Sequence, residues 1–309
     1  MSTITPPVTK LSLKHRLAER GLDRMLWLLV PGAVFIILFF VYPFLYGLNL
    51  SFTPRPGSVA CGDYKGIFAS YQCFFSDSFQ DGWGTIWKTL RLAVPAALFN
   101  VIASVPIAYQ LRGKFRGKRM LQTMLVIPIS LGTVLVAAGL LNFAGQSGWI
   151  NRFLLLIGVI HKPLLMVNNY WGVLLSLIIT GFPFAFLLVS SYMSGIDPSL
   201  EQAAALMGAG WWKRFSRILL PLLAPGLATT FMLTFVLAFS VFPSATLVGD
   251  PANATRVIAL VAYQAFAEKF DYSLASAIAI IMGLVELLVL GLVTAWRSTL
   301  YRGSTGGKG

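Results

Sequence analysis

Residues 163–196 read PLLMVNNYWGVLLSLIITGFPFAFLLVSSYMSGI and contain no Asp, Glu, Lys or Arg. An α-helix needs about 20 predominantly apolar residues to cross the hydrocarbon core of a bilayer. Pro183 lies inside the stretch, and membrane-spanning helices accept proline where neighbouring helices or side chains satisfy the freed carbonyl. This stretch therefore has the length and composition of a membrane-spanning helix.

Stretches of the same kind lie on both sides of it. Four are free of charge and a fifth is interrupted only by Glu286; they cover residues 25–54, 92–111, 120–151, 218–249 and 272–296. The second should begin earlier, with residues 87–90 as its outer turn. The first is too long for a signal-peptide core and lacks a small-x-small cleavage site, so we expect it to be retained. The sequence thus predicts an all-α integral membrane protein with six transmembrane helices.

The charge balance fits a membrane protein better than a nucleic-acid-binding one. Of the 309 residues, 57% are hydrophobic and 11% charged, and the net charge is +13. The basic residues stand in short clusters between apolar stretches, which is how membrane proteins use Lys and Arg. No nucleic-acid-binding motif accompanies them. We therefore expect membrane lipid, and no nucleic acid, among the partners.

The same clusters predict the orientation. Most of the 24 Lys and Arg residues lie in residues 10–24, 112–119, 213–217 and 297–308. These segments all share one side of a six-span chain, and the positive-inside rule places that side, with both termini, in the cytoplasm. The expected division begins with a cytoplasmic N-terminal segment (1–24), a first transmembrane helix (25–50) and an extracytoplasmic loop (51–84). A five-helix core (85–297) with a large cytoplasmic loop at 195–221 follows, and then a cytoplasmic tail (298–309).

Two of these segments leave alternatives open. Leucines alternate with basic residues before the first span, which fits either a short interfacial helix on the inner leaflet or a disordered basic tail. Cys61 and Cys73 both fall in the extracytoplasmic loop, an oxidising location where a disulfide persists. Two free thiols packed in a small cap are the alternative, because sequence does not show whether the Cα atoms approach within about 7 Å.

The loop between the fourth and fifth spans, residues 195–221, reads GIDPSLEQAAALMGAGWWKRFSRILLP. Asp197 suits an N-cap and Pro198 the first helical position, so a small-residue helix should follow. Gly208 and Gly210 should end or turn that helix. A second amphipathic piece is expected up to Pro221. The pattern indicates two short helices joined by a glycine elbow, and an ordinary amphipathic loop on the bilayer is the alternative.

This loop resembles the EAA loop of the inner-membrane permeases of binding-protein-dependent ABC importers. Gln202-Ala203-Ala204 stand at the E-A-A triplet, Gly208 follows at the family spacing, and residues 218–221 match I-x-L-P. Gln202 departs from the family glutamate, with Glu201 one residue earlier. Residues 148–154, GWINRFL, also resemble the family turn G-x-I-N-x-x-L. The resemblance extends more loosely over residues 89–296.

The resemblance implies a type I ABC importer permease fold and an importing direction. The loop would be a coupling helix seated on an ABC ATPase dimer, with either Glu201 or Gln202 as its polar contact. Further partners implied are a second permease, related or identical, and an extracytoplasmic solute-binding protein. The residues implied in ATPase coupling are Glu201, Gln202, Ala203, Ala204, Gly208, Ala209, Trp212, Phe215, Ile218 and Pro221.

The chain itself has no signature of an enzyme. It lacks the G-x-x-x-x-G-K-[ST] phosphate loop, so nucleotide should bind another chain. Its two histidines, His15 and His161, lie outside the spans and leave few groups for acid–base catalysis. Neither histidine is close to the cysteines in sequence, so we expect no metal site and no cofactor.

Four polar residues within the spans are candidates for lining a solute pathway: Glu286, Asn100, Gln110 and Asn142. A carboxylate in a span should face the bundle interior, where it would meet a cationic solute or act only as an inter-helix hydrogen-bonding group. The amides are open to the same two interpretations.

The solute is the least constrained part of the prediction. The sequences of residues 247–250, 263–272 and 200–209 resemble those of permeases for polyamines, iron, sulfate and opines more than those of sugar permeases. Among these we favour a polyamine or similar amino-bearing solute. A self-sufficient secondary transporter or channel is the rival class. It would need inverted repeats or a selectivity ring, and neither shows in the hydropathy.

Overall fold

The computed structural model describes residues 26–53, 61, 64–76, 81–113 and 116–300. The basic segment before the first span lies outside these residues, as does most of the C-terminal tail. The described residues are helical with connecting turns, and no strand occurs among them. The expectation of an all-α architecture is confirmed.

Among the described residues, six helical stretches are long and apolar enough to cross a membrane, as the sequence predicts. The first combines α2 (Leu26–Ile36), η1 (Ile37–Val41) and α3 (Tyr42–Ser51). Single helices form the second, fourth and sixth: α5 (Gly82–Arg112), α8 (Tyr170–Ser194) and α14 (Tyr272–Leu300). The third is α6 (Lys118–Ala144), continued by α7 (Trp149–Leu156). The fifth combines α10 (Trp211–Arg214), η2 (Phe215–Leu219) and α11 (Leu220–Phe239).

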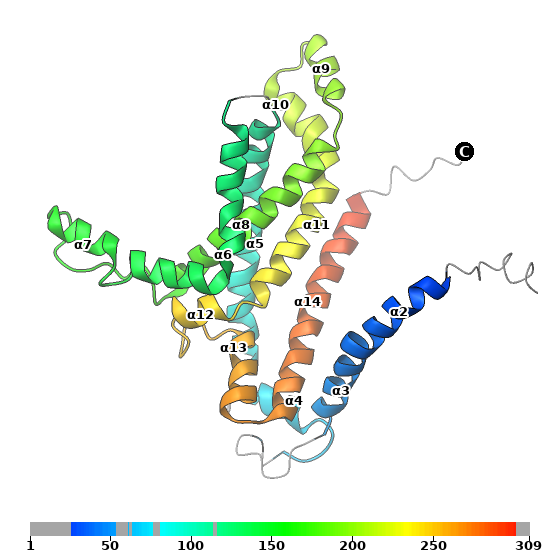
Figure 1. Ribbon diagram of the computed structural model, residues 1–309, viewed down its shortest axis with the longest axis vertical. Coiled ribbons are helices and arrows are strands. Elements are labelled where there is room, and N and C mark those ends of the chain that lie inside the picture. Colours follow the sequence, from blue (N-terminus) through cyan, green and yellow to red (C-terminus); the bar gives the residue numbers. More distant parts are fainter. Residues whose placement is uncertain (1–25, 54–60, 62–63, 77–80, 114–115, 301–309) are drawn as a thin grey trace, which may run out of the picture.

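In the part of the chain that the structure describes, five short elements connect the spans. They are α4 (Ala69–Phe75) before the second span, α9 (Pro198–Leu206) before the fifth, and α12 (Pro243–Leu247), α13 (Ile258–Tyr263) and η3 (Gln264–Glu268) before the sixth. Figure 1 shows α9 and α4 at opposite ends of the molecule. With six spans among the described residues, the start of α2 and the end of α14 both fall on the side of α9.

The centre of the bundle is the packing of α5 against α8, with α11 on both. Small side chains of α5, including Ala93, Ala96 and Ala97, are fully buried there. Small residues let helix backbones approach closely in a membrane, where apolar side chains gain little by leaving lipid. A buried hydrogen bond from the Ile258 amide to Thr89 Oγ1, 2.9 Å long, ties α13 to α5.

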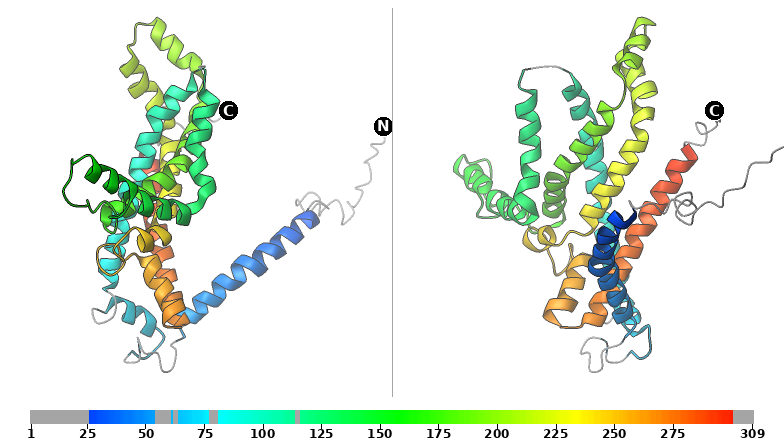
Figure 2. Two further views of the ribbon diagram at one scale, coloured as in Figure 1. Left: turned by 60° about the vertical axis from the view of Figure 1, so that its left-hand side comes forward. Right: turned by 45° about the vertical axis from the view of Figure 1, so that its right-hand side comes forward.

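The first span stands apart from this bundle. It diverges from the other spans towards the start of α2 and meets them through contacts between α3 and α14 (Figure 2). Large apolar side chains along it, such as Phe39 and Phe40, are 65% exposed. An outward-facing apolar surface of this length fits a helix whose environment is a bilayer.

Two predicted spans differ from the observed helices. The third is broken at Gly132, whose φ of 70° and ψ of 164° are not helical, and its second half turns sideways toward α7 (Figure 1). The fifth begins at Trp211 and ends at Phe239, so the expected separate amphipathic piece closed by Pro221 is wrong. Proline removes one helical hydrogen bond and crowds the preceding turn. Here the π-helical turn η2 directly precedes α11, which accepts Pro221 in its first turn.

The loop after the first span carries the disulfide that the sequence left open. Cys61 and Cys73 are bonded, with their Cα atoms 5.6 Å apart. Cys73 belongs to α4, and both cysteines are buried in the same apolar cluster as Phe74 and Leu274. The bridge thus attaches the loop to the ends of α5 and α14 that are remote from α9, and the alternative of two free thiols is excluded.

Candidate functional site: the loop between the fourth and fifth spans

Helix α9 begins as its sequence predicts. Asp197 is the N-cap, and its carboxylate accepts a hydrogen bond of 2.9 Å from the Ser199 amide. Pro198 follows in the first turn, where a missing N–H costs nothing. Hydrogen bonds from the backbone and side chain of Ser199 lower the pKa of Asp197 below its ordinary value. The cap therefore stays ionised, which favours a helix N-terminus.

The elbow that ends α9 depends on one glycine. Gly208 has a φ of 78°, in the left-handed region. The amides of Gly208 and Ala209 donate to the carbonyls of Ala205 and Ala204, both over 3.0 Å, and so satisfy the helix end. Gly210 has an ordinary φ of −63° and caps α10. Only the first of the two predicted glycines is therefore required by backbone conformation.

The three residues of the E-A-A-like triplet, 202–204, differ in their solvent exposure. Gln202 and Ala203 are exposed, whereas Ala204 is buried against the protein itself. The most exposed large apolar side chains of the loop are Leu206 at 91% and Met207 at 83%. They lie in the helical turn before the elbow, at the end of the molecule marked by α9 (Figure 1). Two bare apolar side chains at a projecting tip indicate a surface that another protein covers.

Sequence reasoning missed Leu206 and Met207 because they resemble interior residues of a small helix. The usable signal was their position directly before the left-handed glycine, where the chain reverses. Ala209 is half-buried in the elbow.

Glu201 turns toward the end of α5. Its Oε1 lies 2.5 Å from Arg112 Nη1, and Tyr109 donates its hydroxyl proton to Oε2 over 3.1 Å. Arg112 also donates to the Ile196 carbonyl. The side chains of Arg112 and Glu201 are only 19% and 13% exposed. These contacts attach α9 to the end of α5, and they leave Gln202 as the outward polar residue of the triplet.

An aromatic cluster attaches the second half of the loop to the same end of α5. Tyr109 packs edge-on against Trp211 and Phe215, with ring centroids 6.2 and 5.8 Å apart. Trp212 stacks on Phe215 and is 66% exposed. Beyond the cluster, Ile218 is half-buried, Leu219 is fully buried and Pro221 is exposed. Tyr109, Arg112 and Leu219 were not expected at this site, because their partners are remote in sequence.

The four candidate pathway residues do not form one site. Asn100 is buried, donates 3.4 Å to the Leu177 carbonyl and fills the space left by Gly181, so it joins α5 to α8. Gln110 is exposed beside the apolar groove formed by α5, α10 and α11. Asn142 is exposed and donates to its own helix at Ala138.

Glu286 is half-buried in α14. Its Oε1 is buried and has no hydrogen-bond partner among the described residues. A buried carboxylate oxygen without a donor is costly in a span unless another group reaches it. Asn100 Oδ1 is likewise buried without a partner among the described residues, so of the four candidates Asn100 and Glu286 keep an unsatisfied oxygen, and only Glu286 is ionisable.

Comparison with known proteins agrees with this architecture. The family model of the binding-protein-dependent transport system inner membrane component matches residues 100–299. A probable sulfate transport system permease protein of Prototheca wickerhamii is 31% identical over 206 residues, covering 66% of this chain and 79% of that protein. The spermidine/putrescine transport system permease protein of Haemophilus influenzae is 25% identical over 266 residues, covering 85% and 90%.

One solved structure has the same fold over nearly the whole length. A bacterial ABC transporter that imports the acidic polysaccharide alginate contains a chain that superposes with a TM-score of 0.77 at 21% identity. The match covers 94% of this chain and 100% of that one. The expected ABC importer permease fold is thereby confirmed.

Proposed function

Since this chain belongs to the family of inner-membrane components of binding-protein-dependent transport systems, we propose that α9 and its elbow couple it to an ABC ATPase. The chain is a multi-pass inner-membrane permease of an ABC importer. The coupling proposal rests on the exposed apolar side chains of Leu206 and Met207 at the end of α9. Helix α9 is itself hydrogen-bonded to α5 through Arg112 and Glu201.

The coupling proposal requires α9 to face the cytoplasm, where ATP is available. The clusters of Lys and Arg at residues 112–119 and 213–217 support that orientation, because they lie beside the loop. The disulfide supports it from the opposite side, since bonds between cysteines persist in an oxidising compartment. Both termini then lie in the cytoplasm.

The mechanism follows from what α9 contacts. An ATPase that closes on ATP would push the tip, and the Arg112–Glu201 pair would transmit the displacement to α5. Because α5 packs against α8 and α11, these helices would move together and open the outer face to a docked binding protein. The ATPase is a dimer in this scheme. A second permease, related to this chain, completes the pathway, because six spans form one half of it.

Cross-linking tests the coupling proposal. Met207→Cys places a thiol at the tip, while the native cysteines stay bonded to each other. In membranes that contain the whole transporter, we expect a bifunctional thiol reagent to join Met207→Cys to a nucleotide-hydrolysing protein. Leu156→Cys, which is 84% exposed on the opposite side, is the matched control and should give no such product. Failure to capture an ATPase from the tip would contradict the proposal.

For the solute, we propose a small amino-bearing cation of the polyamine type. Glu286 supports this choice, because a carboxylate with an unsatisfied buried oxygen attracts an ammonium group and repels an anion. Sulfate is the second candidate, favoured by the relative from Prototheca wickerhamii. In both cases the solute would arrive on an extracytoplasmic binding protein.

Uptake measurements separate the two solutes. In proteoliposomes containing the whole transporter, we expect ATP-driven uptake of labelled spermidine or putrescine and none of labelled sulfate. Glu286→Gln should reduce amine uptake at least about tenfold, equivalent to about 1.4 kcal/mol of lost interaction. Glu286→Asp, which keeps the charge, should retain most of it. Sulfate uptake that is unaffected by Glu286→Gln would establish the anion instead, without affecting the coupling proposal.

A further inference from the structure

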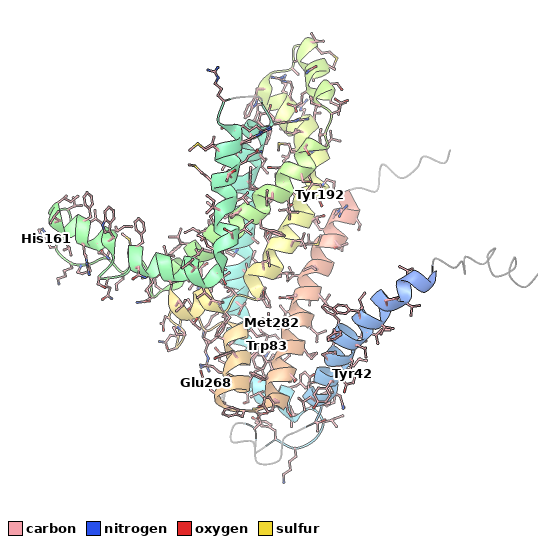
Figure 3. All side chains as sticks on the ribbon, in the orientation of Figure 1. Tyr42, Trp83, His161, Tyr192, Glu268 and Met282 are labelled. Atoms are coloured by element: carbon pink, nitrogen blue, oxygen red, sulfur yellow. A yellow bond between two sulfur atoms is a disulfide. The ribbon has the colours of Figure 1, made fainter. Side chains whose placement is uncertain are left out.

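The segment between α6 and α8 projects from the bundle. Helix α7 and the return stretch 157–169 extend sideways from the bundle, at a level between α9 and α4 (Figures 1 and 2). They follow the end of the third span that is remote from α9. His161 lies at the far end of the projection (Figure 3). None of the coupling residues belongs to it.

This projection is held in a defined shape by one buried amide. Asn151 is fully buried, and its Nδ2 donates to the carbonyls of Gly145 (2.8 Å) and Leu164 (3.0 Å). The Leu164 amide donates back to Asn151 Oδ1 over 2.8 Å. At Gly148, a Cβ would lie 2.7 Å from the Phe143 carbonyl, so the turn requires glycine. The orientation of α7 is therefore determined by the fold.

The face of α7 turned away from Asn151 is apolar and bare. Trp149, Phe153 and Leu156 recur at helical spacing and are 67%, 50% and 84% exposed. Phe143, Trp149 and Phe153 stack in sequence, with centroids 6.3 and 5.9 Å apart. Phe143 belongs to the third span, so the apolar face of α7 continues the outward surface of a membrane helix.

The charged residues of the projection are basic. Arg152 and Lys162 are exposed, and residues 145–169 contain no Asp or Glu. Basic side chains beside tryptophan and other aromatics are typical of helices at the boundary between acyl chains and headgroups. The charge is complementary to anionic lipid phosphates.

We propose that α7 lies in the plane of the bilayer interface on the side opposite α9. The stripe Trp149–Phe153–Leu156 enters the acyl region, and Arg152 and Lys162 bind anionic phospholipid headgroups. Continuity with the lipid-facing surface at Phe143 favours lipid over a protein as the occupant. The interface contact would anchor the second half of α6, which follows the break at Gly132. This proposal does not depend on which solute is carried.

Spin labels measure the depth directly. The full chain is reconstituted in nanodiscs of phosphatidylethanolamine and phosphatidylglycerol, with a nitroxide at Phe153→Cys or Leu156→Cys. Ala252→Cys, exposed in a loop on the same side, is the aqueous control, and Leu284→Cys, 58% exposed in α14, is the bilayer control. We expect both α7 labels to match Leu284→Cys, with high collision rates for oxygen and low rates for a water-soluble nickel chelate.

Accessibility equal to that of Ala252→Cys at both α7 positions would overturn the proposal. Nickel accessibility that disappears only when the solute-binding protein is added would also overturn it, by assigning the face to protein docking.

The headgroup contact is tested separately. Arg152→Gln combined with Lys162→Gln should at least halve the enrichment of phosphatidylglycerol around the protein, measured with a spin-labelled lipid. Unchanged enrichment would refute the headgroup contact. Leu156 makes a suitable second position because its side chain is 84% exposed, so its loss leaves the fold intact.

Discussion

Gly208→Val is expected to abolish ATP-driven uptake while membrane insertion remains normal. The residue adopts a φ of 78°, and an L-residue in the left-handed region costs about 1–2 kcal/mol. A β-branched side chain raises that cost, so the elbow would rearrange and carry Leu206 and Met207 out of position. We expect the affinity for the ATPase to fall at least about tenfold, measured by co-purification and by ATPase activity of the assembled transporter.

Gly210→Val provides the matched control. Gly210 has a φ of −63°, which any residue adopts, and a Cβ there meets no atom within 4 Å. The two variants add the same side chain two residues apart, so a difference between them isolates the left-handed conformation. Normal uptake with Gly208→Val would count heavily against α9 as the coupling element. Equal loss in both variants would point to steric exclusion by the partner and not to the elbow.

Arg112→Met is expected to uncouple ATP hydrolysis from transport. The change removes the cation from a pair in which Glu201 is only 13% exposed. A carboxylate left without its partner in such a site costs on the order of 1–3 kcal/mol, which is enough to detach α9 from α5. We expect uptake to fall by at least about tenfold while ATP hydrolysis by the assembled complex persists, because the tip of Leu206 and Met207 is unchanged.

The reversed pair tests whether the contact itself matters. Arg112→Glu combined with Glu201→Arg keeps one positive and one negative charge at the site, so uptake should recover in part relative to either single change. Tyr109→Phe, which removes only the 3.1 Å hydrogen bond to Glu201, should cause a smaller loss. If Arg112→Met lowers uptake and hydrolysis in proportion, the pair only stabilises the fold. Full uptake in Arg112→Met would show that motion reaches the spans by another route.

The local parts of the loop could be predicted because they depend on neighbouring residues. Asp197 and Pro198 start α9 as expected, since capping requires only the residues within one turn. The turn at Gly208 followed from its spacing. The role of Glu201 could not be predicted, because its partner Arg112 is 89 residues away in the sequence. In the sequence, Arg112 belongs to a basic cluster, and the positive-inside rule already accounts for that cluster. The break of the third span at Gly132 was also hidden, since its hydropathy is continuous.

Sequence alone determined the six membrane-crossing helices, the loop that joins the fourth to the fifth and the segment that contains both cysteines. A helix needs about 20 apolar residues to cross the hydrocarbon core, so each crossing can be recognised from the composition of its segment. Tertiary structure alone decided that Cys61 and Cys73 are bonded, that Glu201 turns inward while Leu206 and Met207 stay bare, and that α7 projects sideways. Those outcomes depend on which distant side chains meet, and apolar segments of equal hydropathy carry no information about their neighbours.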